Sequence, residues 1–383
     1  MPDGLLQHAL IAVTAATVTA GVTPLVARLA RRLGALDTPS DGRRVHRDAV
    51  PTLGGLAMLA GLLVALVVAA LLGGPFEALF TSTSEPLALL VGGLVIVLVG
   101  VADDLVGLPP TVKLAGQIVA ALGVVLFGMQ LVYVWVPGVD VVALSPDLGL
   151  PLTIIALVAM INAVNLIDGL DGLAAGVSVI AAVAFFLFAS ATEGSGLVEG
   201  IPTSATLVAA IVAGVGVGFL VHNWHPARIF MGDTGAMLLG LLLGTAGVSY
   251  IGRTTAPSNT DFYGSIPLLV PVLVLAIPFL DSAFAIVRRA LQRKPLATGD
   301  LGHLHHLLLA FGHSHRRAVL VLYYWSALLA FGSVGPVFVP LVRLLPWLLV
   351  AAGIGLALTA LGARVGLAED GDQTVPARDR TTA

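Results

Sequence analysis

The sequence contains no cysteine, and only 11% of its 383 residues are charged. The absence of cysteine excludes disulfide bridges, thiolate zinc sites and a cysteine nucleophile. Soluble domains carry charge on about 25% of their residues. A chain with so few charges and 57% hydrophobic residues cannot cover a water-exposed surface. The composition therefore excludes a soluble enzyme, a nucleic-acid-binding protein and a disordered chain, and it indicates a protein of the lipid bilayer.

Long apolar runs recur along most of the chain. A bilayer core about 30 Å thick requires about 20 apolar residues per helix. The runs predict an all-α, polytopic membrane protein with about eleven transmembrane helices. We expect these helices at residues 5–27, 52–73, 86–103, 112–135, 151–166, 173–192, 203–222, 235–252, 264–288, 317–339 and 344–364.

The cationic residues predict the orientation of the helices. Arg28, Arg31 and Arg32 directly follow the first apolar run, and no Lys or Arg precedes it, which is the reverse of a cleavable signal peptide. The positive-inside rule then places the N-terminus outside and the C-terminus in the cytoplasm, and of 19 Lys and Arg residues only Arg253 and Arg343 fall outside. We expect a multi-pass protein of the plasma membrane, with one membrane domain over residues 1–366 and a polar, disordered tail over residues 367–383.

Under this topology, the unusual polar residues gather on the cytoplasmic face. Ionisable groups at membrane depth are costly and usually functional, so their sorting to one face predicts a single site. The segments are Arg43–His46, Asp103–Asp104 with Lys113, Asn162–Gly172, Met231–Gly235 and His303–His306.

Carboxylates and amides dominate three of these segments. Asp103 and Asp104 repel each other, and a divalent cation or the nearby Lys113 would relieve that repulsion; an ordinary charged helix end is the alternative. In the segment Asn162–Gly172, two asparagines and then two aspartates recur at every third position. This spacing predicts a helix end that brings these side chains to the rim of a pocket; a simple polar turn is the alternative. The four residues are Asn162, Asn165, Asp168 and Asp171.

Asp233 lies in a Gly-Asp-Thr-Gly stretch that precedes an apolar run. Its carboxylate would serve either as the N-cap of that helix or as a ligand for Mg²⁺, which prefers carboxylate and amide oxygens.

The histidines do not form a zinc motif of the His-Glu-x-x-His type. With several arginines nearby, the loop carrying His303, His305 and His306 instead indicates an anion site for phosphates. His313 and His315 either belong to this anion site or are solvated, and we favour solvation. His222 and His225, which flank a tryptophan, suit an interfacial position.

Metal-binding carboxylates beside cations at a membrane surface indicate phosphoryl transfer between a soluble substrate and a lipid substrate. A secondary transporter is the alternative from another class. It would be expected to place ionisable groups near the bilayer midplane, often in two matching halves, and the sequence shows no such repeat.

The ordered segments resemble the polyprenyl-phosphate N-acetylhexosamine-1-phosphate transferases of glycosyltransferase family 4. Asp103-Asp104 matches the family's aspartate pair, Asn162–Gly172 matches Asn-x-x-Asn-x-x-Asp-Gly-x-Asp-Gly, and Met231–Gly235 matches Met-Gly-Asp-Thr-Gly. The His303-Leu304-His305-His306 pattern is similar to the branch that uses UDP-N-acetylglucosamine. The phospho-N-acetylmuramoyl-pentapeptide branch, which usually has three consecutive histidines, is the alternative.

The resemblance implies an enzyme that makes polyprenyl-diphosphate-N-acetylglucosamine and UMP from UDP-N-acetylglucosamine and undecaprenyl or decaprenyl phosphate, at the start of cell-wall or surface-polysaccharide synthesis. The predicted topology puts the active site on the cytoplasmic face, the composition excludes a nucleic-acid partner, and a homodimer is one possible assembly. Asp233 and Asn165 would hold Mg²⁺, for which Mn²⁺ could substitute. The catalytic set would be Asp103, Asp104, Asp168, Asp171 and His303, in which Asp103 deprotonates or positions the lipid phosphate with support from Asp104. The substrate contacts would be Arg44, His46, Lys113, Asn162, Asp171, His303, His305 and His306.

Overall fold

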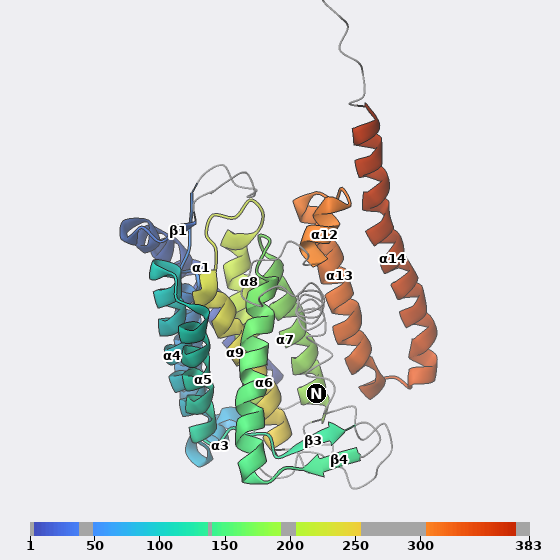
Figure 1. The fold of residues 1–383 in the computed structure, drawn as a ribbon. Helices are drawn as coiled ribbons and strands as arrows, with labels where there is room; N and C mark the ends of the chain where they lie inside the picture. Colours follow the sequence, from blue (N-terminus) through green and yellow to red (C-terminus); the bar gives the residue numbers. More distant parts are fainter. Residues whose placement is uncertain (1–3, 38–48, 137–139, 193–203, 254–303, 373–383) are drawn as a thin grey trace, which may run out of the picture.

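The computed structural model describes residues 4–37, 49–136, 140–192, 204–253 and 304–372, which form a bundle of helices (Figure 1). Nine helices in this part of the chain are long and apolar enough to cross a membrane, and α5 (Pro110–Leu126) is a shorter apolar helix. The nine are α1 (Leu5–Leu33), α2 (Gly55–Leu72), α4 (Glu85–Val106), α6 (Pro146–Ile167), α7 (Leu173–Thr192), α8 (Ala205–Asn223), α9 (Gly232–Arg253), α13 (His315–Val334) and α14 (Leu341–Asp372). The predicted all-α, polytopic membrane fold is confirmed.

Short elements join these helices. They include the helices α3 (Glu77–Ser82) and α12 (Leu304–Ala310) and the 3₁₀ turns η1 (Gly74–Phe76) and η2 (Gly335–Val337). Strands β1 (Leu36–Asp37) and β2 (Val50–Pro51) pair antiparallel, with Leu36 opposite Pro51. Strands β3 (Tyr133–Val136) and β4 (Asp140–Ala143) form a second antiparallel pair, with Tyr133 opposite Ala143.

Several predicted boundaries differ from the structure. The predicted helix at 112–135 ends at Leu126, because the chain then turns through Gly128 at a positive φ of 89° and enters β3. Helix α6 begins at Pro146 rather than at residue 151. Helix α14 continues through residues 367–372, which the sequence assigns to the tail. The predicted span at 264–288 lies outside the described residues.

Helix α9 occupies the centre of the bundle, and α14 lies at its periphery. Within the best membrane-spanning window, 89% of α9 residues are buried, compared with 6% for α14. Helices α2, α4, α6 and α8 pack around α9. The first turn of α9 approaches α4 so closely that a Cβ atom at Gly100 would overlap the backbone of Thr234. Glycine at position 100 therefore sets how near α9 can lie to the end of α4.

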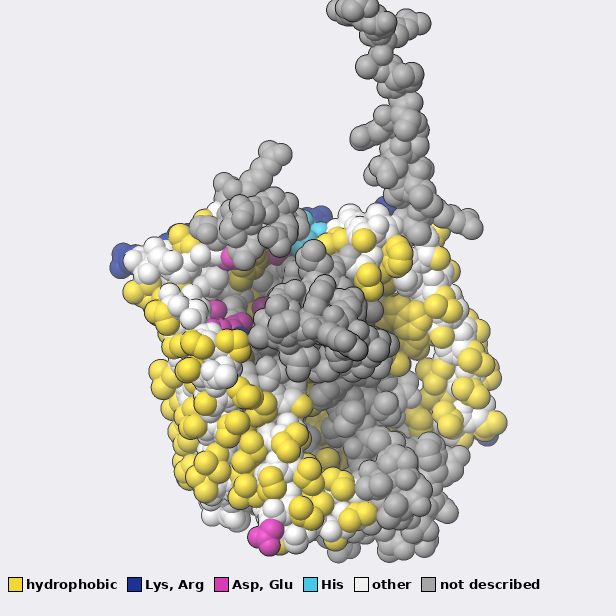
Figure 2. Space-filling view, viewed as in Figure 1, with side chains coloured by type: hydrophobic (Ala, Val, Ile, Leu, Met, Phe, Trp, Pro, Cys, Tyr) yellow, Lys and Arg dark blue, Asp and Glu magenta, His cyan; other side chains and the backbone are white. Residues whose placement is uncertain are grey.

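The two ends of the bundle have different chemistry. We call the end where α4 finishes and α9 begins the site end; it is uppermost in Figure 1, and the β3–β4 pair lies at the opposite end. In the view of Figure 2, hydrophobic side chains cover the flanks of the molecule, whereas acidic and histidine side chains gather toward the site end. A band of apolar flanks bounded by polar ends is the surface expected of a protein that spans a bilayer.

Candidate active site

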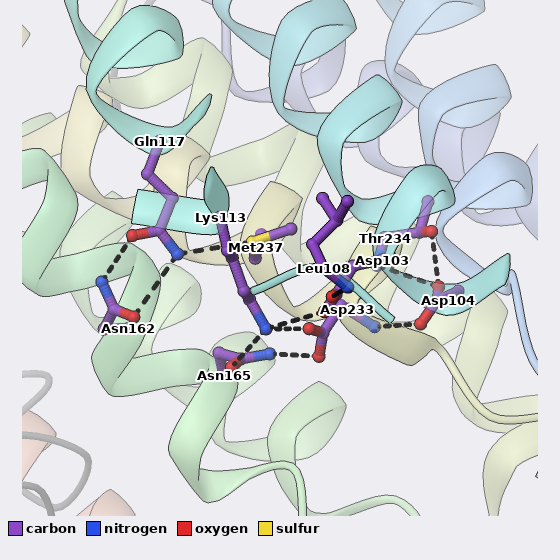
Figure 3. A network of polar contacts seen from close by, with 10 residues as sticks. All are labelled: Asp103, Asp104, Leu108, Lys113, Gln117, Asn162, Asn165, Asp233, Thr234 and Met237. Atoms are coloured by element: carbon purple, nitrogen blue, oxygen red, sulfur yellow. Dashed lines mark hydrogen bonds and ion pairs between the residues drawn. The ribbon is translucent and has the colours of Figure 1, made fainter. Parts of the chain in front are cut away.

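Lys113 is the centre of a polar cluster at the site end (Figure 3). Its Nζ lies 3.1 Å from Oδ2 of Asp103, donates a hydrogen bond to Oδ1 of Asn165 at 3.5 Å, and forms an ion pair with Asp233. The four residues come from α5, α4, α6 and α9 respectively. The ends of four helices thus bring one ammonium group against oxygens that are far apart in the sequence. We call Asp103, Lys113, Asn165 and Asp233 the lysine cluster.

Neighbouring groups fix the oxygens of the lysine cluster. Oδ1 of Asp103 accepts a hydrogen bond from the backbone N–H of Leu108 at 2.7 Å, just after α4 ends. The side-chain amide of Asn165 donates to Oδ1 of Asp233 at 2.8 Å. Each carboxylate is therefore held through one oxygen while its other oxygen faces Lys113.

Asp104 supplies the N-cap of α9 from a different helix. Its Oδ1 accepts the backbone N–H of Asp233 at 2.9 Å, and its Oδ2 accepts the N–H and the hydroxyl of Thr234 at 3.2 and 2.6 Å. Gly232 begins α9 at a φ of +67°, and a Cβ there would collide with the Asp104 carboxylate. The first N–H groups of a helix lack partners within the helix, and a carboxylate there also interacts favourably with the helix dipole.

This capping argues against one of the two interpretations of Asp233, that its side chain is the N-cap of α9. The cap position is filled by Asp104, so the side chain of Asp233 is available to Lys113 and Asn165. The resemblance implies that Asp104 supports Asp103; in the structure the hydrogen bonds of the Asp104 side chain go to the start of α9.

The segment Asn162–Gly172 is divided between two places. Helix α6 ends at Ile167, as the spacing predicted. Asn165 joins the lysine cluster. Asn162 instead pairs with Gln117 of α5: Nδ2 of Asn162 donates to Oε1 of Gln117 at 2.7 Å, and Nε2 of Gln117 donates to Oδ1 of Asn162 at 3.4 Å. Asn162 therefore joins α6 to α5 beside the site rather than facing its rim.

Asp171 belongs to a second cluster. Its Oδ2 accepts hydrogen bonds from Nδ1 of His225 at 2.7 Å and from the backbone N–H of Ala227 at 3.0 Å, and its own N–H donates to Nε2 of His315 at 3.0 Å. The rings of His225 and His315 stack with centroids 4.2 Å apart. We call Asp171, His225 and His315 the histidine junction, because it joins the α6–α7 loop, the α8–α9 loop and the start of α13.

The interpretation of His313 and His315 needs correction, and His222 and His225 make contacts that the sequence did not predict. His315 stacks in the histidine junction and His313 is buried, with Nε2 2.9 Å from the Thr359 carbonyl, so neither is simply solvated. His225 binds Asp171, and Nε2 of His222 lies 2.9 Å from the Ala20 carbonyl of α1, so both make specific contacts beyond an interfacial position.

Asp168 lies between the two clusters, just beyond the end of α6. Burial raises the pKa of its carboxyl group to about 7, and the negative charges of Asp104 and Asp171 contribute to the rise. A carboxyl group with this pKa changes its charge near neutral pH, which is common at functional sites.

Several predicted residues are not placed by the structure. Arg44, His46 and His303 lie outside the described residues. His305 and His306 lie on α12, which packs against α13, but their side chains are outside the described set.

Sequence reasoning missed Gln117 and Asn223. Gln117 follows Lys113 by one helical turn, and that spacing was a usable signal. Asn223, the last residue of α8, accepts the N–H of Gly172 at 2.9 Å and donates to the Ile229 carbonyl at 2.9 Å. This contact between a helix end and two loops has no sequence pattern.

The lysine cluster has the chemistry of a hard-cation site. Asp103, Asp233 and Asn165 direct carboxylate and amide oxygens at one point, and a positively charged group, the ammonium of Lys113, already lies there. Mg²⁺ is usually bound by one or two carboxylates together with water and substrate phosphates. The donor set therefore fits Mg²⁺. The histidine junction also brings three ligand atoms within 4.8 Å of one another, but each of its residues makes one of the hydrogen bonds described above.

Comparison with known proteins identifies the family of the chain. Residues 86–251, which contain both clusters except His315, match glycosyl transferase family 4. The chain is 40% identical over 345 residues to a decaprenyl-phosphate N-acetylglucosaminephosphotransferase of Mycobacterium tuberculosis, covering 87% of this chain and 83% of the relative. It is 36% identical over 305 residues to a probable undecaprenyl-phosphate N-acetylglucosaminyl 1-phosphate transferase of Bacillus subtilis, covering 79% and 77%.

The name of a more distant relative indicates a different substrate. A phospho-N-acetylmuramoyl-pentapeptide-transferase of Mycolicibacterium paratuberculosis is 35% identical over 283 residues, covering 65% of this chain and 77% of the relative. The predicted resemblance is confirmed: the chain is a multi-pass membrane phosphotransferase that belongs to glycosyl transferase family 4.

Proposed function

We propose that this protein transfers N-acetylglucosamine 1-phosphate from UDP-N-acetylglucosamine to a polyprenyl phosphate and releases UMP. The observation that carries the proposal is the convergence of the Asp103, Asn165 and Asp233 oxygens on one point at an end of the membrane bundle. A site at the end of a membrane helix can be reached by a lipid phosphate from the bilayer and by a soluble nucleotide from water. The names of the relatives that cover most of the chain support a polyprenyl phosphate as the acceptor and N-acetylglucosamine phosphate as the transferred group.

In this reaction an oxygen of the lipid phosphate attacks the phosphorus that carries the sugar. A P–O bond forms there, and the bond from that phosphorus to the oxygen of UMP breaks. The lipid phosphate has a second pKa near 6, so it arrives largely ionised and needs positioning more than deprotonation. Asp103 and Lys113, at the site end, are placed to orient it.

Asp233 and Asn165, with Asp103 beside them, would hold Mg²⁺. The chemistry that such an ion supplies is neutralisation of the diphosphate charge and stabilisation of the departing UMP. Asp104 holds the first turn of α9 and thereby fixes Asp233. The histidine junction shapes the loops beside the site, and we assign the nucleotide to that side, with His303, His305 and His306 contacting phosphates and sugar.

The direct test is UMP release by the purified protein in lipid nanodiscs. We expect release only when UDP-N-acetylglucosamine, polyprenyl phosphate and Mg²⁺ are all present. Release that does not depend on the lipid phosphate would contradict the proposed reaction.

The donor is tested by competition. Equal concentrations of UDP-N-acetylglucosamine and UDP-N-acetylmuramoyl-pentapeptide should yield almost only the N-acetylglucosamine product. A preference for the pentapeptide donor would assign the chain to the branch of its more distant relative.

The proposal places the site on the cytoplasmic face of the plasma membrane, within one membrane domain and in a homodimer. Because the chain has no cysteine, single cysteines report its orientation without background. Ser84 and Ser314 are exposed and lie at opposite ends of the bundle. In intact cells an impermeant thiol reagent should label Ser84→Cys and leave Ser314→Cys unmodified; the reverse pattern would put the site outside.

A further inference from the structure

The ammonium of Lys113 has surroundings that resemble those of a bound metal ion. Oxygens from α4, α6 and α9 face it, those of Asp103 and Asn165 at 3.1 and 3.5 Å, and that of Asp233 in an ion pair. The side chains of Lys113 and Asp103 are only 19% and 15% exposed. The lysine thus neutralises, away from bulk water, the same hard oxygens that would bind a divalent cation.

Groups other than the lysine also hold these oxygens. The Leu108 N–H holds Asp103, and the Asn165 amide holds Asp233. The Asp104 cap fixes the backbone from which Asp233 extends. An empty cage of this kind would still be formed if the ammonium left, and the flexible four-carbon stem of lysine allows it to leave.

Two cations cannot share these oxygens at low cost, because like charges a few ångströms apart in a partly buried site repel strongly. We propose that Lys113 and the divalent cation exclude each other from one position: the ammonium occupies it in the metal-free protein and is released when the metal binds. This inference rests on the metal site of the proposed function. The released ammonium is then free to bind a substrate phosphate, so arrival of the metal prepares the second phosphate contact.

The first test measures metal affinity without turnover. Mn²⁺ binding to the full-length protein in nanodiscs is followed by electron paramagnetic resonance. Lys113→Met, which keeps the length of the side chain but removes its charge, should bind Mn²⁺ at least tenfold more tightly than the native protein. Lys113→Gln should also bind more tightly, and Lys113→Arg, which keeps the charge, should not.

The same measurement separates the inference from the proposed function. If Mn²⁺ binds to the native protein and Lys113→Met and Lys113→Gln bind with equal or lower affinity, the exclusion is wrong while the metal site stands. If the native protein and Lys113→Met both fail to bind Mn²⁺, the metal site of the proposed function is wrong as well.

The second test uses the small number of lysines. The chain has only Lys113 and Lys294, so an amine-acylating reagent followed by mass spectrometry reports on each. Adding Mg²⁺ should raise the modification of Lys113 several-fold. In Asp233→Asn, Lys113 should be modified readily without Mg²⁺ and should not respond to it. Unchanged modification of native Lys113 at Mg²⁺ concentrations that displace bound Mn²⁺ would overturn the exchange.

Discussion

The lysine cluster and the histidine junction both hold aspartates at the site end, but they use them differently. In the histidine junction, Asp171 is 5% exposed and its Oδ2 accepts two hydrogen bonds. In the lysine cluster, Asp103 and Asp233 share one ammonium and Asp104 lies alongside, so negative charge is in excess. An excess of charge attracts a further cation, whereas a carboxylate hydrogen-bonded to an imidazole and a backbone N–H mainly fixes loops. Aspartates at the same end of the bundle therefore have different roles: those of the lysine cluster attract a cation, and Asp171 fixes loops.

The largest effect should follow from removing charge in the lysine cluster. Asp233→Asn keeps the shape but loses the charge that holds the metal, and we expect UMP release to fall about 100- to 1000-fold, which is the size of strong electrostatic effects in catalysis. The thermal unfolding midpoint should change little, because Asp104 still caps α9. Near-native turnover at limiting Mg²⁺ would show that Asp233 does not bind the metal.

A smaller loss should follow from removing the cap. Asp104→Ala leaves the N–H groups of Asp233 and Thr234 without an acceptor, which destabilises a helix start by about 1–2 kcal/mol. A misplacement of Asp233 by about 1 Å can cost about 100-fold in rate, so we expect kcat to fall about 10- to 100-fold. Asp104→Asn retains one acceptor oxygen and should recover part of this loss; equal activity of the two variants would mean that Asp104 acts by its charge instead.

Breaking the histidine junction should affect stability and substrate binding more than chemistry. Asp171→Ala leaves the His225 and Ala227 donors without their acceptor, which costs about 1–3 kcal/mol. His315→Ala removes the acceptor of the Asp171 N–H and the ring that stacks on His225. For both variants we expect a lower unfolding midpoint and a several-fold higher KM for the nucleotide donor, with kcat nearly unchanged.

His313→Ala is the matched control for this comparison. His313 contacts the Thr359 carbonyl of α14 rather than the junction. The variant His313→Ala should lower the unfolding midpoint and leave the KM for the nucleotide donor unchanged. A loss of kcat in His315→Ala as large as in Asp233→Asn would erase the distinction between the two clusters.

The smallest effect concerns pH. Burial raises the pKa of Asp168 to about 7, whereas an aspartate in the unfolded chain has a pKa near 3.9. Between pH 4 and 7 the folded protein therefore holds a proton that the unfolded chain releases, and the free energy of unfolding decreases as pH rises. Asp168→Asn should lose this component, so its unfolding midpoint should fall less between pH 5 and 7. If the unfolding midpoint falls equally with pH in the native protein and in the variant, Asp168 does not make this contribution.

Much of the lysine cluster could be predicted from the sequence, because orientation alone puts Asp103, Asn165 and Asp233 at the same end of the membrane helices. Lys113 could be proposed as a partner of Asp103 and Asp104, with a divalent cation as the alternative, because either cation would relieve the repulsion between two adjacent carboxylates. Its contacts with Asn165 and Asp233 were not predicted. The capping of α9 by Asp104 could not be predicted. It depends on which helices pack side by side, and Gly100 allows that approach without leaving a periodic pattern.

The histidine junction could not be predicted for a related reason. The three-residue spacing of Asn162, Asn165, Asp168 and Asp171 suggested a common rim, but α6 ends at Ile167 and the chain then turns toward His225 and His315. Contacts between two loops and the start of α13 arise from the completed fold. The helix at 112–135 was overextended because an apolar strand and an apolar helix differ little in composition over so few residues.

The central position of α9 has a consequence for biosynthesis. Its best membrane-spanning window has the lowest mean hydropathy of the nine candidate spans, at 1.6. Such a segment is stabilised more by packing against other helices than by contact with lipid. Helices α2, α4, α6 and α8, against which it packs, all precede it in the chain and are therefore made first. Asp233 enters with α9, so the nascent chain cannot complete the lysine cluster until its ninth described helix has joined the bundle.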